Sequence, residues 1–299
     1  MNKLKTLLVA GLMLLSQANI SANAQSKNIF YADQLVARLT QLADTFPAEV
    51  GMAFSIEGET FETHNNLHFP LLSVVKFYQA LAICNRLGET GIPIYSTIRI
   101  EPEELMKDTW SPMLEFYGNG GKISIDKLLE YSLVQSDNNA CNILFDRVLG
   151  TEYTENHING IVEGACSIIA DEKMMRDDPT LCYDNWSNPV SAVKLMEHFY
   201  QKRNDENFRI VWNFMSECNT GENRIPKYLH DYATVIHKTG TGPVTANGNI
   251  MAVNDVACVV LPNGRHFCLA VFIKDAQCSM ARCEELIATM AQKCFEYFY

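Results

Sequence analysis

The stretch Phe69-Pro70-Leu71-Leu72-Ser73-Val74-Val75-Lys76 opens an apolar segment that continues to Leu81. Pro70 disfavours helix at the residue before it, so the sequence predicts a helix that begins just after it. Ser73 then lies in the first turn, and Lys76 lies on the same side of the helix. A hydroxyl at this place sits in the positive field of the helix end, beside backbone N–H groups without partners in the helix.

These residues alone leave two interpretations open. In the first, Lys76 is neutral or shares its proton, so that it can take the hydroxyl proton of Ser73 and make it a nucleophile. In the second, Ser73 caps the helix and Lys76 lies on the surface. A Ser-x-x-Lys pattern is expected about once by chance in a chain of this length. The rest of the sequence must therefore decide.

The chain of 299 residues begins with a pattern typical of a secretory signal peptide. Two lysines precede the apolar segment Leu7–Leu15, and Ala22-Asn23-Ala24 has the small residues of a cleavage site. We assign residues 1–24 to a signal peptide and expect a periplasmic or secreted protein after cleavage near Ala24. The apolar segment is too short to span a bilayer, and no later segment reaches that length.

Charge and cysteine content exclude several classes of function. The formal net charge is −11 at pH 7, without a run of basic residues, so we expect no nucleic acid and no anionic membrane as partner. A monomer with a small-molecule substrate is expected. The ten cysteines include no Cys-x-x-Cys motif, and their pairing cannot be read from the sequence. His64 and His68 lack a third ligand nearby, so neither a metal nor another cofactor is expected.

Periodicity predicts helices and strands in a definite order. Helices are expected over Asn28–Phe46, from Ser73 to near Gly88, over Ile125–Leu133, from Asp137 or Asn138 to Leu149, and over Pro189–Phe199, Asn207–Cys218 and Met280–Phe298. Strands are expected over Val50–Ile56, Thr60–Thr63, Thr234–His237, Gly248–Val253, Val256–Leu261 and Phe267–Ile273. The segment Cys166–Trp186 has no clear period and is predicted to be a long ordered loop, a type that usually carries function.

This order nests a mostly helical middle between two groups of strands. It predicts an antiparallel sheet built from both chain ends, covered by the terminal helices, with an inserted helical lobe. We assign residues 25–66 and 227–299 to the α/β lobe and residues 67–226 to the helical lobe, together one domain. A cleft between the two lobes is the expected site.

Two further motifs follow Ser73-x-x-Lys76, namely Ser136-Asp137-Asn138 and Lys238-Thr239-Gly240. They lie between two predicted helices and at the end of a predicted strand. The three motifs in this order are a known signature of class A β-lactamases and penicillin-binding proteins. Chance agreement of order, context and spacing is small, which favours the nucleophile interpretation of Ser73.

The chain resembles the penicillin-recognising serine hydrolases, and within them the class A β-lactamases, over essentially all residues after 24. The resemblance implies the β-lactamase/DD-peptidase fold, of class α/β (α+β), with a five-stranded antiparallel sheet and an inserted all-helical lobe. It implies hydrolysis of the β-lactam amide of cephalosporins and penicillins through an acyl-enzyme on Ser73. Lys76 would then belong to the activating network, and Ser136, assisted by Lys238, would relay a proton to the leaving nitrogen.

The resemblance also implies the substrate-binding positions. Asn138 would hold the acyl side-chain amide, and the backbone N–H of Thr241 would complete an oxyanion hole with that of the nucleophile. Thr239 and Thr241, with Ser136, would receive the substrate carboxylate. Arg224 stands where some family members place a carboxylate-binding arginine, although it could equally be a surface residue.

Removal of the acyl group needs a base that holds a water against the ester. In class A enzymes this base is a glutamate on a long loop, and Glu172 is our candidate. Three nearby acids leave open that the loop is simply a solvated segment: Asp171, Asp177 and Asp178.

The same loop departs from most of the family. An arginine before the glutamate and its aspartate partner at the far end of the loop are replaced by Ala170 and Asn185, so that anchor is absent. Arg176 replaces an asparagine that helps to hold the water. The loop resembles that of a divergent subgroup that includes cephalosporinases and extended-spectrum enzymes. We therefore expect a differently folded loop and a roomier cleft with Trp110 at its mouth, unless Trp110 is a packed aromatic.

Two other functions remain open. A D-alanyl-D-alanine carboxypeptidase or penicillin-binding protein would use the same motifs, but the loop that carries Glu172 argues against it. A β-lactam-binding module without turnover would keep the fold, but the complete set of motif residues argues against it.

Overall fold

A five-stranded antiparallel sheet with the strand order β2-β1-β10-β9-β8 joins the two ends of the chain. The computed structural model describes residues 32–56, 58–64 and 67–298, so the predicted signal peptide lies outside the described residues. The strands are β1 (Glu49–Ile56), β2 (Glu59–Thr63), β8 (Thr234–Thr241), β9 (Ile250–Val260) and β10 (His266–Ala276). The nested order is confirmed, and so is the α/β (α+β) fold class.

Strand β9 is continuous, whereas the sequence predicted two strands separated at Asn254 and Asp255. Both polar side chains are fully buried, and each has a partner outside the strand. The amide of Asn254 donates to the carbonyl of Pro70 at 2.7 Å, and the carboxylate of Asp255 accepts from the backbone N–H of Ile225 at 3.2 Å. These residues looked like a break in the strand because their partners lie far away in the sequence.

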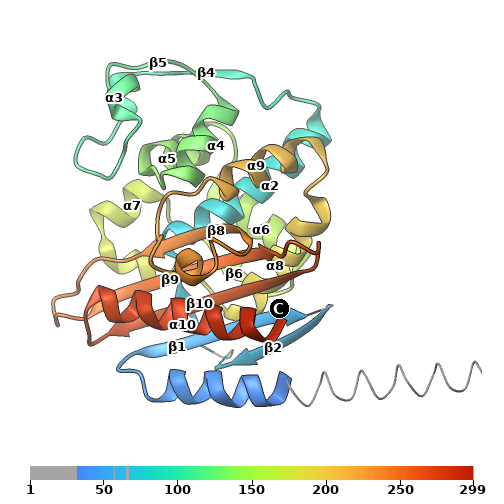
Figure 1. Ribbon diagram of the computed structural model, residues 1–299. Coiled ribbons are helices and arrows are strands. Elements are labelled where there is room, and N and C mark those ends of the chain that lie inside the picture. The colour runs from blue at the N-terminus through green and yellow to red at the C-terminus, as the bar shows by residue number, and fades with distance from the viewer. Residues whose placement is uncertain (1–31, 57, 65–66, 299) are drawn as a thin grey trace, which may run out of the picture.

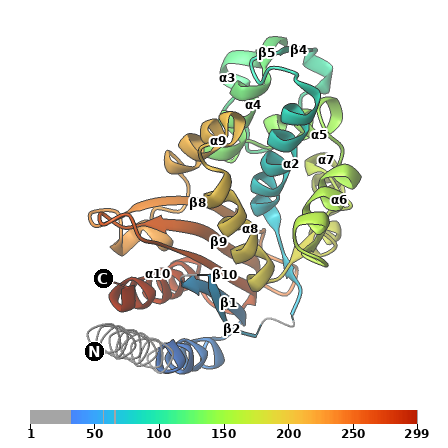
Figure 2. The same ribbon diagram turned by 90° about the vertical axis from the view of Figure 1, so that its right-hand side faces the viewer.

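Helices cover both faces of this sheet (Figures 1 and 2). On one face lie α10 (Met280–Phe298) and the helix over residues 32–44, which with the sheet bury a core that includes Leu39, Phe54 and Ile287. The terminal helices predicted from the sequence are therefore present, although residues 28–31 of the first lie outside the described part. The other face packs against α8 (Pro189–Lys202) and, beyond it, the inserted lobe.

The inserted lobe is mostly rather than entirely helical. Its other helices are α2 (Val75–Thr90), α3 (Leu114–Tyr117), α4 (Ile125–Val134), α5 (Asn138–Arg147), α6 (Thr151–Ile161), α7 (Glu172–Asp177) and α9 (Glu206–Ser216). The 3-10 turns are η1 (Leu72–Val74), η2 (Pro102–Glu104), η3 (Pro179–Tyr183) and η4 (Ile225–Tyr228). Two small sheets were not expected: β4 (Thr97–Ile100) with β5 (Gly121–Ser124), and β3 (Phe69–Pro70) with β7 (Trp186–Ser187) and β6 (Cys166–Ser167).

Helix α2 lies at the centre of the inserted lobe and carries the opening stretch of the sequence. Residues from Val75 to Cys84 are all buried, so the helix is enclosed on every side and has no solvent face in this part. It ends at Thr90, beyond the predicted end near Gly88, because Gly91 adopts the left-handed conformation (φ 67°) that closes a helix. In the described part of the chain, no helix has the length and apolar character needed to cross a bilayer.

Candidate active site

Ser73 lies in the 3-10 turn η1, directly before α2. Leu72 before it has a positive φ of 46°, which is a strained conformation for a leucine. Strand β8 lies against this turn so closely that a Cβ on Gly240 would stand 2.5 Å from the carbonyl oxygen of Leu71. The glycine of Lys-Thr-Gly is therefore a steric requirement, since only glycine lets the strand approach the nucleophile turn.

Lys76 is fully buried and makes three hydrogen bonds through Nζ. It donates to Ser73 Oγ at 2.8 Å, to Asn138 Oδ1 at 2.9 Å and to Glu172 Oε1. Burial alone would lower the pKa of Lys76, but the charge of Glu172 and the hydrogen bond to it outweigh burial, so the pKa is raised. The lysine is thus a cation in the resting site and not the surface residue of the alternative interpretation.

Ser136 and Lys238 form a second buried pair across the cleft. Lys238 Nζ donates to Ser136 Oγ at 2.9 Å and to the carbonyl of Thr239 at 3.0 Å. Ser136 has a positive φ of 57° between α4 and α5. Asp137 stabilises this corner, because its buried carboxylate accepts from the backbone N–H groups of Ala140, at 2.9 Å, and Met113, at 2.8 Å.

Burial lowers the pKa of Lys238 to about 8. The charges of Lys76 and Arg224 lower it further, whereas those of Cys218 and Asp255 act in the opposite direction. Lys238 is therefore still mostly cationic at neutral pH but loses its proton in mildly alkaline solution.

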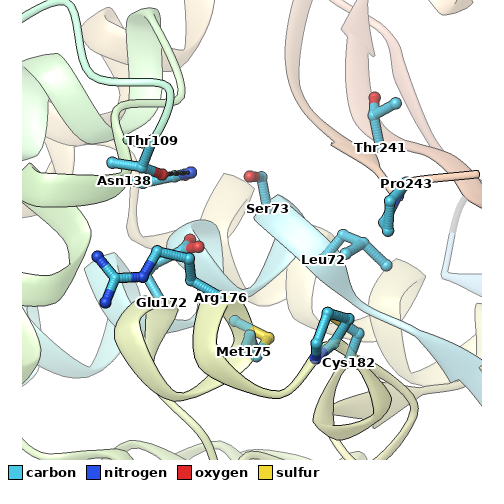
Figure 3. A pocket seen from close by; sticks show the side chains of 11 residues that line it. Leu72, Ser73, Thr109, Asn138, Glu172, Met175, Arg176, Cys182, Thr241 and Pro243 are labelled. Carbon is cyan, nitrogen blue, oxygen red and sulfur yellow. Dashed lines mark hydrogen bonds between the residues drawn. The ribbon is translucent and has the colours of Figure 1, made fainter. Parts of the chain in front are cut away.

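Asn138 stands between the lysine network and the mouth of the cleft. While its Oδ1 accepts from Lys76, its Nδ2 donates to Thr109 Oγ1 at 2.9 Å (Figure 3). Trp110, the next residue, is 63% exposed, and its indole N–H donates to the carbonyl of Gln135 at 2.8 Å. Trp110 thus lines the mouth of the cleft and is not packed in the core. Thr109, which also lines the cleft, was not predicted as a site residue from the sequence.

Hydroxyl groups line the end of the cleft that β8 provides. Thr239 Oγ1 lies 2.7 Å from Thr220 Oγ1, a residue that the sequence motifs do not include. Arg224 Nη2 donates to Thr241 Oγ1 at 2.7 Å. The side chain of Arg224 is only 5% exposed, and Nη1 donates to the carbonyls of Gly240 and Asn254. Arg224 is therefore not a surface arginine. It lies behind β8 and positions the hydroxyl of Thr241.

Glu172 is the first residue of α7, within the segment predicted to be a loop. Its side chain is 11% exposed and faces Lys76. The other acids point elsewhere: Asp171 caps α7, Asp177 binds Arg176, and Asp178 caps η3. The geometry therefore singles out Glu172 among the acids that the sequence left open.

Hydrogen bonds from the side-chain amide of Asn185 replace the missing salt bridge of this segment. Asn185 Oδ1 accepts from the backbone N–H groups of Ile169, at 2.9 Å, and Ala170, at 3.0 Å, and Asn185 Nδ2 donates to the carbonyl of Ala170 at 2.7 Å. Ala170 and Asn185, the two positions without the usual charges, are thus joined by hydrogen bonds from the buried Asn185 side chain. The expected loss of the arginine–aspartate pair therefore stands, but the sequence did not show that an uncharged side chain binds the opposite backbone directly.

Arg176 lies at the rim of the cleft, with its guanidinium partly exposed. Its Nη1 donates to Asp108 at 2.9 Å and its Nη2 to Asp177 at 2.6 Å. Arg176 therefore ties α7 to the segment before Trp110 instead of facing Glu172.

Two adjoining cavities of about 260 Å³ and 270 Å³ meet at Ser73, Asn138 and Thr241. The first is also lined by Leu72, Thr109, Glu172, Met175, Arg176, Pro179, Cys182 and Pro243, and the second by Trp110, Ser136, Thr220 and Thr239. The Ser73 hydroxyl points into the open space between Asn138 and Thr241 (Figure 3). Two serine hydroxyls, each bound by a buried lysine, and a carboxylate therefore surround one space, an arrangement suited to acyl transfer.

The histidines of the sequence analysis do not meet at a metal site. His64 Nε2 lies 2.7 Å from Asp44 Oδ1, whereas His68 stacks on Trp186. Cys258 and Cys268 are direct cross-strand neighbours in β9 and β10, so they share one face, and both are free thiols. A group that the sequence did not suggest does have ligand atoms within 4.8 Å of one another: Glu197, His266 and Cys268.

Comparison with known proteins gives a consistent result. Residues 34–298 match the model of the Beta-lactamase enzyme family. The chain is 31% identical over 285 residues to β-lactamase VEB-1 of Pseudomonas aeruginosa, with 93% of each chain covered. The crystal structure of TLA-3 extended-spectrum β-lactamase superposes with a TM-score of 0.86 at 30% identity, over 89% of this chain and 99% of that one. A class A β-lactamase structure from Bacteroides cellulosilyticus gives a TM-score of 0.85 at 29% identity, over 89% and 98%.

Proposed function

This chain belongs to the class A serine β-lactamases, and on that basis we propose that it hydrolyses the β-lactam amide of cephalosporins and penicillins through an acyl-enzyme on Ser73. The observation that carries the proposal is the hydrogen-bonding of one buried lysine. Lys76 binds the hydroxyl of Ser73 and the carboxylate of Glu172 at once. The group that forms the acyl bond and the group that activates water for its hydrolysis are therefore linked through a single ammonium.

Acylation begins with loss of the Ser73 proton. Because Lys76 is a cation in the resting site, it cannot accept this proton until it has passed one of its own to Glu172. The short contact between the two groups provides that path, after which the neutral Nζ is 2.8 Å from Ser73 Oγ and acts as the base. Ser73 then attacks the lactam carbonyl, whose oxygen is held by the backbone N–H groups of Ser73 and Thr241.

Opening of the lactam ring requires a proton on the leaving nitrogen. Ser136 supplies it, and Lys238 at 2.9 Å replaces the proton that Ser136 gives up. The substrate carboxylate binds the hydroxyls of Ser136, Thr239 and Thr241. Arg224 positions the Thr241 hydroxyl from behind the strand and adds positive charge to this end of the cleft.

Deacylation is assigned to Glu172, which borders the same cavity as Ser73 and Asn138. Before this step, solvent carries to Lys238 the proton that Glu172 gained from Lys76, so that Glu172 is again a carboxylate and Lys238 again a cation. The carboxylate takes a proton from a water molecule, the resulting hydroxide attacks the ester on Ser73, and the proton then passes to the departing Ser73 oxygen. The hydrolysed product leaves with Ser73 and Lys76 in their original states. Asn138 holds the acyl side-chain amide during this step.

A Glu172→Gln substitution tests the assignment of the base. The variant should still be acylated by a chromogenic cephalosporin, because without the Glu172 carboxylate burial lowers the pKa of Lys76 and its neutral amine can take the Ser73 proton directly. It should release product slowly, because an amide cannot accept the proton of water at neutral pH. Intact-mass spectrometry should then show a stable adduct on Ser73, whereas the unmodified protein should turn over without one. Asp177→Asn is a matched control in the same helix, since its carboxylate binds the exposed Arg176 and an exposed ion pair contributes only about 0–1 kcal/mol.

Three outcomes are informative. Rapid deacylation by Glu172→Gln would assign the base to another residue. A permanent adduct on the unmodified protein would indicate a binding module. Release of D-alanine from a cell-wall peptide, with slow lactam turnover, would indicate a peptidase.

The proposal also covers the oligomeric state, the localisation and the lobe boundaries of the enzyme. We infer a monomer that reaches the periplasm or the exterior after removal of residues 1–24, with residues 25–66 and 227–299 as one lobe and residues 67–226 as the other. The cavity beside Glu172 supports cephalosporins with large side chains as substrates, and the TLA-3 structure is that of an extended-spectrum enzyme. Rates for a panel of penicillins and cephalosporins would test the substrate preference.

A further inference from the structure

Three side chains with different ligand atoms meet where α8 packs on β10: Glu197, His266 and Cys268. A carboxylate oxygen, a ring nitrogen and a sulfur from these residues all lie within 4.8 Å of one another. Helix α8 and strand β10 are in direct contact at this face of the sheet (Figure 2). None of the three residues lines the two cavities around Ser73. The cluster is therefore separate from the site proposed for lactam hydrolysis.

The period of a β-strand explains why two of these groups come together. His266 and Cys268 are two residues apart at the start of β10, so their side chains leave the same face of the sheet. Helix α8 covers this face, since Cys268 belongs to the same apolar core as Phe199 of that helix. Glu197 precedes Phe199 on α8 and meets the two strand residues from the opposite side. One strand and one facing helix thus supply all three groups.

Partners outside the cluster hold these side chains in place. The hydroxyl of Ser55 on β1 donates to Glu197 Oε1 and accepts from the backbone N–H of Cys268 at 3.2 Å. The other carboxylate oxygen, Oε2, is left for His266, whose Nε2 lies 3.0 Å away. The His266 ring stacks on Tyr200, with 3.5 Å between the ring centroids and 16° between the planes. The carboxylate and the imidazole are thus oriented as the ligands of a metal ion are by their outer-shell partners.

The cluster is open to solvent on one side and closed on the other. The side chains of His266 and Glu197 are 23% and 21% exposed, whereas Cys268 is fully buried. A cation from solvent can therefore reach the imidazole and the carboxylate and meet the sulfur beneath them. The negative charges of a thiolate and a carboxylate would balance a divalent cation, so that no net charge is buried.

We propose that Glu197, His266 and Cys268 form a Zn²⁺ site that joins α8 to β10. A thiolate, an imidazole and a carboxylate are a ligand set that suits zinc, whereas Mg²⁺ and Ca²⁺ prefer oxygen ligands only. On binding, Cys268 releases its thiol proton to solvent, and His266 is neutral with its hydrogen on Nδ1, so that Nε2 can bind the ion. Three protein ligands leave the fourth tetrahedral position to a water molecule on the exposed side.

Titration of the reduced, metal-free protein with Zn²⁺ in competition with a chromophoric chelator tests the proposal. Each chain should bind a single zinc ion. His266→Gln removes a partly exposed ligand, and it should lower the affinity by more than the about 10–100-fold that is typical for loss of an outer-shell partner. His198→Gln is the matched control, because His198 follows Glu197 on the same helix but does not belong to the cluster. This control should bind zinc as the unmodified protein does.

Titration with Co²⁺ identifies the sulfur ligand. A thiolate bound to Co²⁺ gives a charge-transfer absorption band in the near ultraviolet, which the unmodified protein should show and Cys268→Ser should lack. Cys278→Ser is the control, because Cys278 and Cys283 are another pair of neighbouring thiols, with 3.6 Å between their sulfurs. Its cobalt spectrum should be unchanged. Far-UV circular dichroism confirms the fold of each variant, and His266→Gln keeps the test valid if a serine at the buried position 268 unfolds the chain.

The melting temperature gives an independent measurement. Zinc should raise that of the unmodified protein, because a ligand that binds the folded state stabilises it, but should not raise that of His266→Gln. Equal zinc affinities of these two proteins, or no zinc binding at all, would mean that the three side chains form only a hydrogen-bonded network. A cobalt band that is lost in Cys278→Ser and kept in Cys268→Ser would also overturn the proposal.

Discussion

Lys76 shows at the residue scale how burial and charge act against each other in this site. A lysine without solvent contact would ordinarily lose its proton, yet the Glu172 carboxylate keeps it charged. Lys238 Nζ instead binds the Ser136 hydroxyl and the carbonyl of Thr239, and burial prevails over the charge of Asp255, so its pKa falls to about 8. Two buried lysines of one site therefore have different protonation behaviour, and the difference depends on one neighbouring acid.

The alkaline limb of the pH profile of kcat/KM should report the loss of the Lys238 proton. The site needs the cation, so activity should fall as the pH rises through about 8. Burial would raise the pKa of Cys218, but His237 and Lys238 lower it to about 6. The resulting negative charge raises the pKa of Lys238, and Cys218→Ser removes that charge. The alkaline limb of the variant should therefore lie at lower pH than that of the unmodified enzyme. Cys278 lines neither cavity, so Cys278→Ser should leave the limb in place. An unchanged limb in Cys218→Ser would contradict this coupling.

At the scale of elements, β8 approaches η1 closely next to Ser73. Gly240→Ala would place a methyl group 2.5 Å from the carbonyl of Leu71, where the backbone cannot yield as a side chain could. We expect a loss of stability of about 1–3 kcal/mol, as for overpacked sites, together with a marked loss of turnover. Gly88→Ala is the matched control, because nothing lies within 4 Å of its added methyl group. That change should stabilise α2 by about 0.5–1 kcal/mol. Chemical denaturation of both variants would measure the contrast.

The side-chain hydrogen bonds of Asn185 help to position Glu172 at the start of α7. Asn185→Ala would leave the backbone groups of Ile169 and Ala170 without these partners, and each buried group left unpaired costs about 1–3 kcal/mol. The expected result is a lower melting temperature and a deacylation rate that falls more than the acylation rate, because Glu172 is displaced while Ser73 is not. Burst-phase kinetics with a chromogenic cephalosporin separate the two rates.

A control in the same segment is Thr180→Ala, which loses only an exposed hydrogen bond to Asp178. It should behave like the unmodified enzyme. Equal losses of the acylation and deacylation rates in Asn185→Ala would argue against a specific role of Asn185 in positioning Glu172.

At the scale of the whole molecule, the two lobes share one apolar core. The cluster beneath α2 contains Phe77 and Phe199 from the helical side and Val256 and Phe272 from the sheet. Neither lobe can therefore bury this surface alone. The active site lies where the two meet, with Ser73 and Glu172 contributed by the inserted lobe and Lys238 by β8.

Unfolding should accordingly be a single cooperative transition despite the size of the chain. Far-UV and near-UV circular dichroism should change together with the loss of lactam hydrolysis as guanidinium increases. Two separated transitions would show that the lobes are independently stable, which would contradict the division into two lobes of one domain.

Residue type and local spacing were enough to predict the chemical groups of the site and their order along the chain. Ser73, Lys76, Ser136 and Lys238 could be identified because residue type and local spacing are properties of the chain, and each lies at a helix start or strand end that short-range signals predict. The hairpin of β9 and β10 and the terminal helix α10 follow from the same local patterns. Periodicity failed at Asn254 and Asp255, where long-range partners make polar residues compatible with a buried strand.

The contacts between these groups could not be predicted in this way, because they depend on how the chain folds in three dimensions. Four features join residues from separate parts of the chain: the contact of Lys76 with Glu172, the burial of Arg224 behind β8, the hydrogen bonds of Asn185 and the pair of His237 with Asp255. A hydrogen bond or a pKa depends on distances of a few ångströms and on exclusion of water. Those quantities arise only when segments remote in the chain pack together.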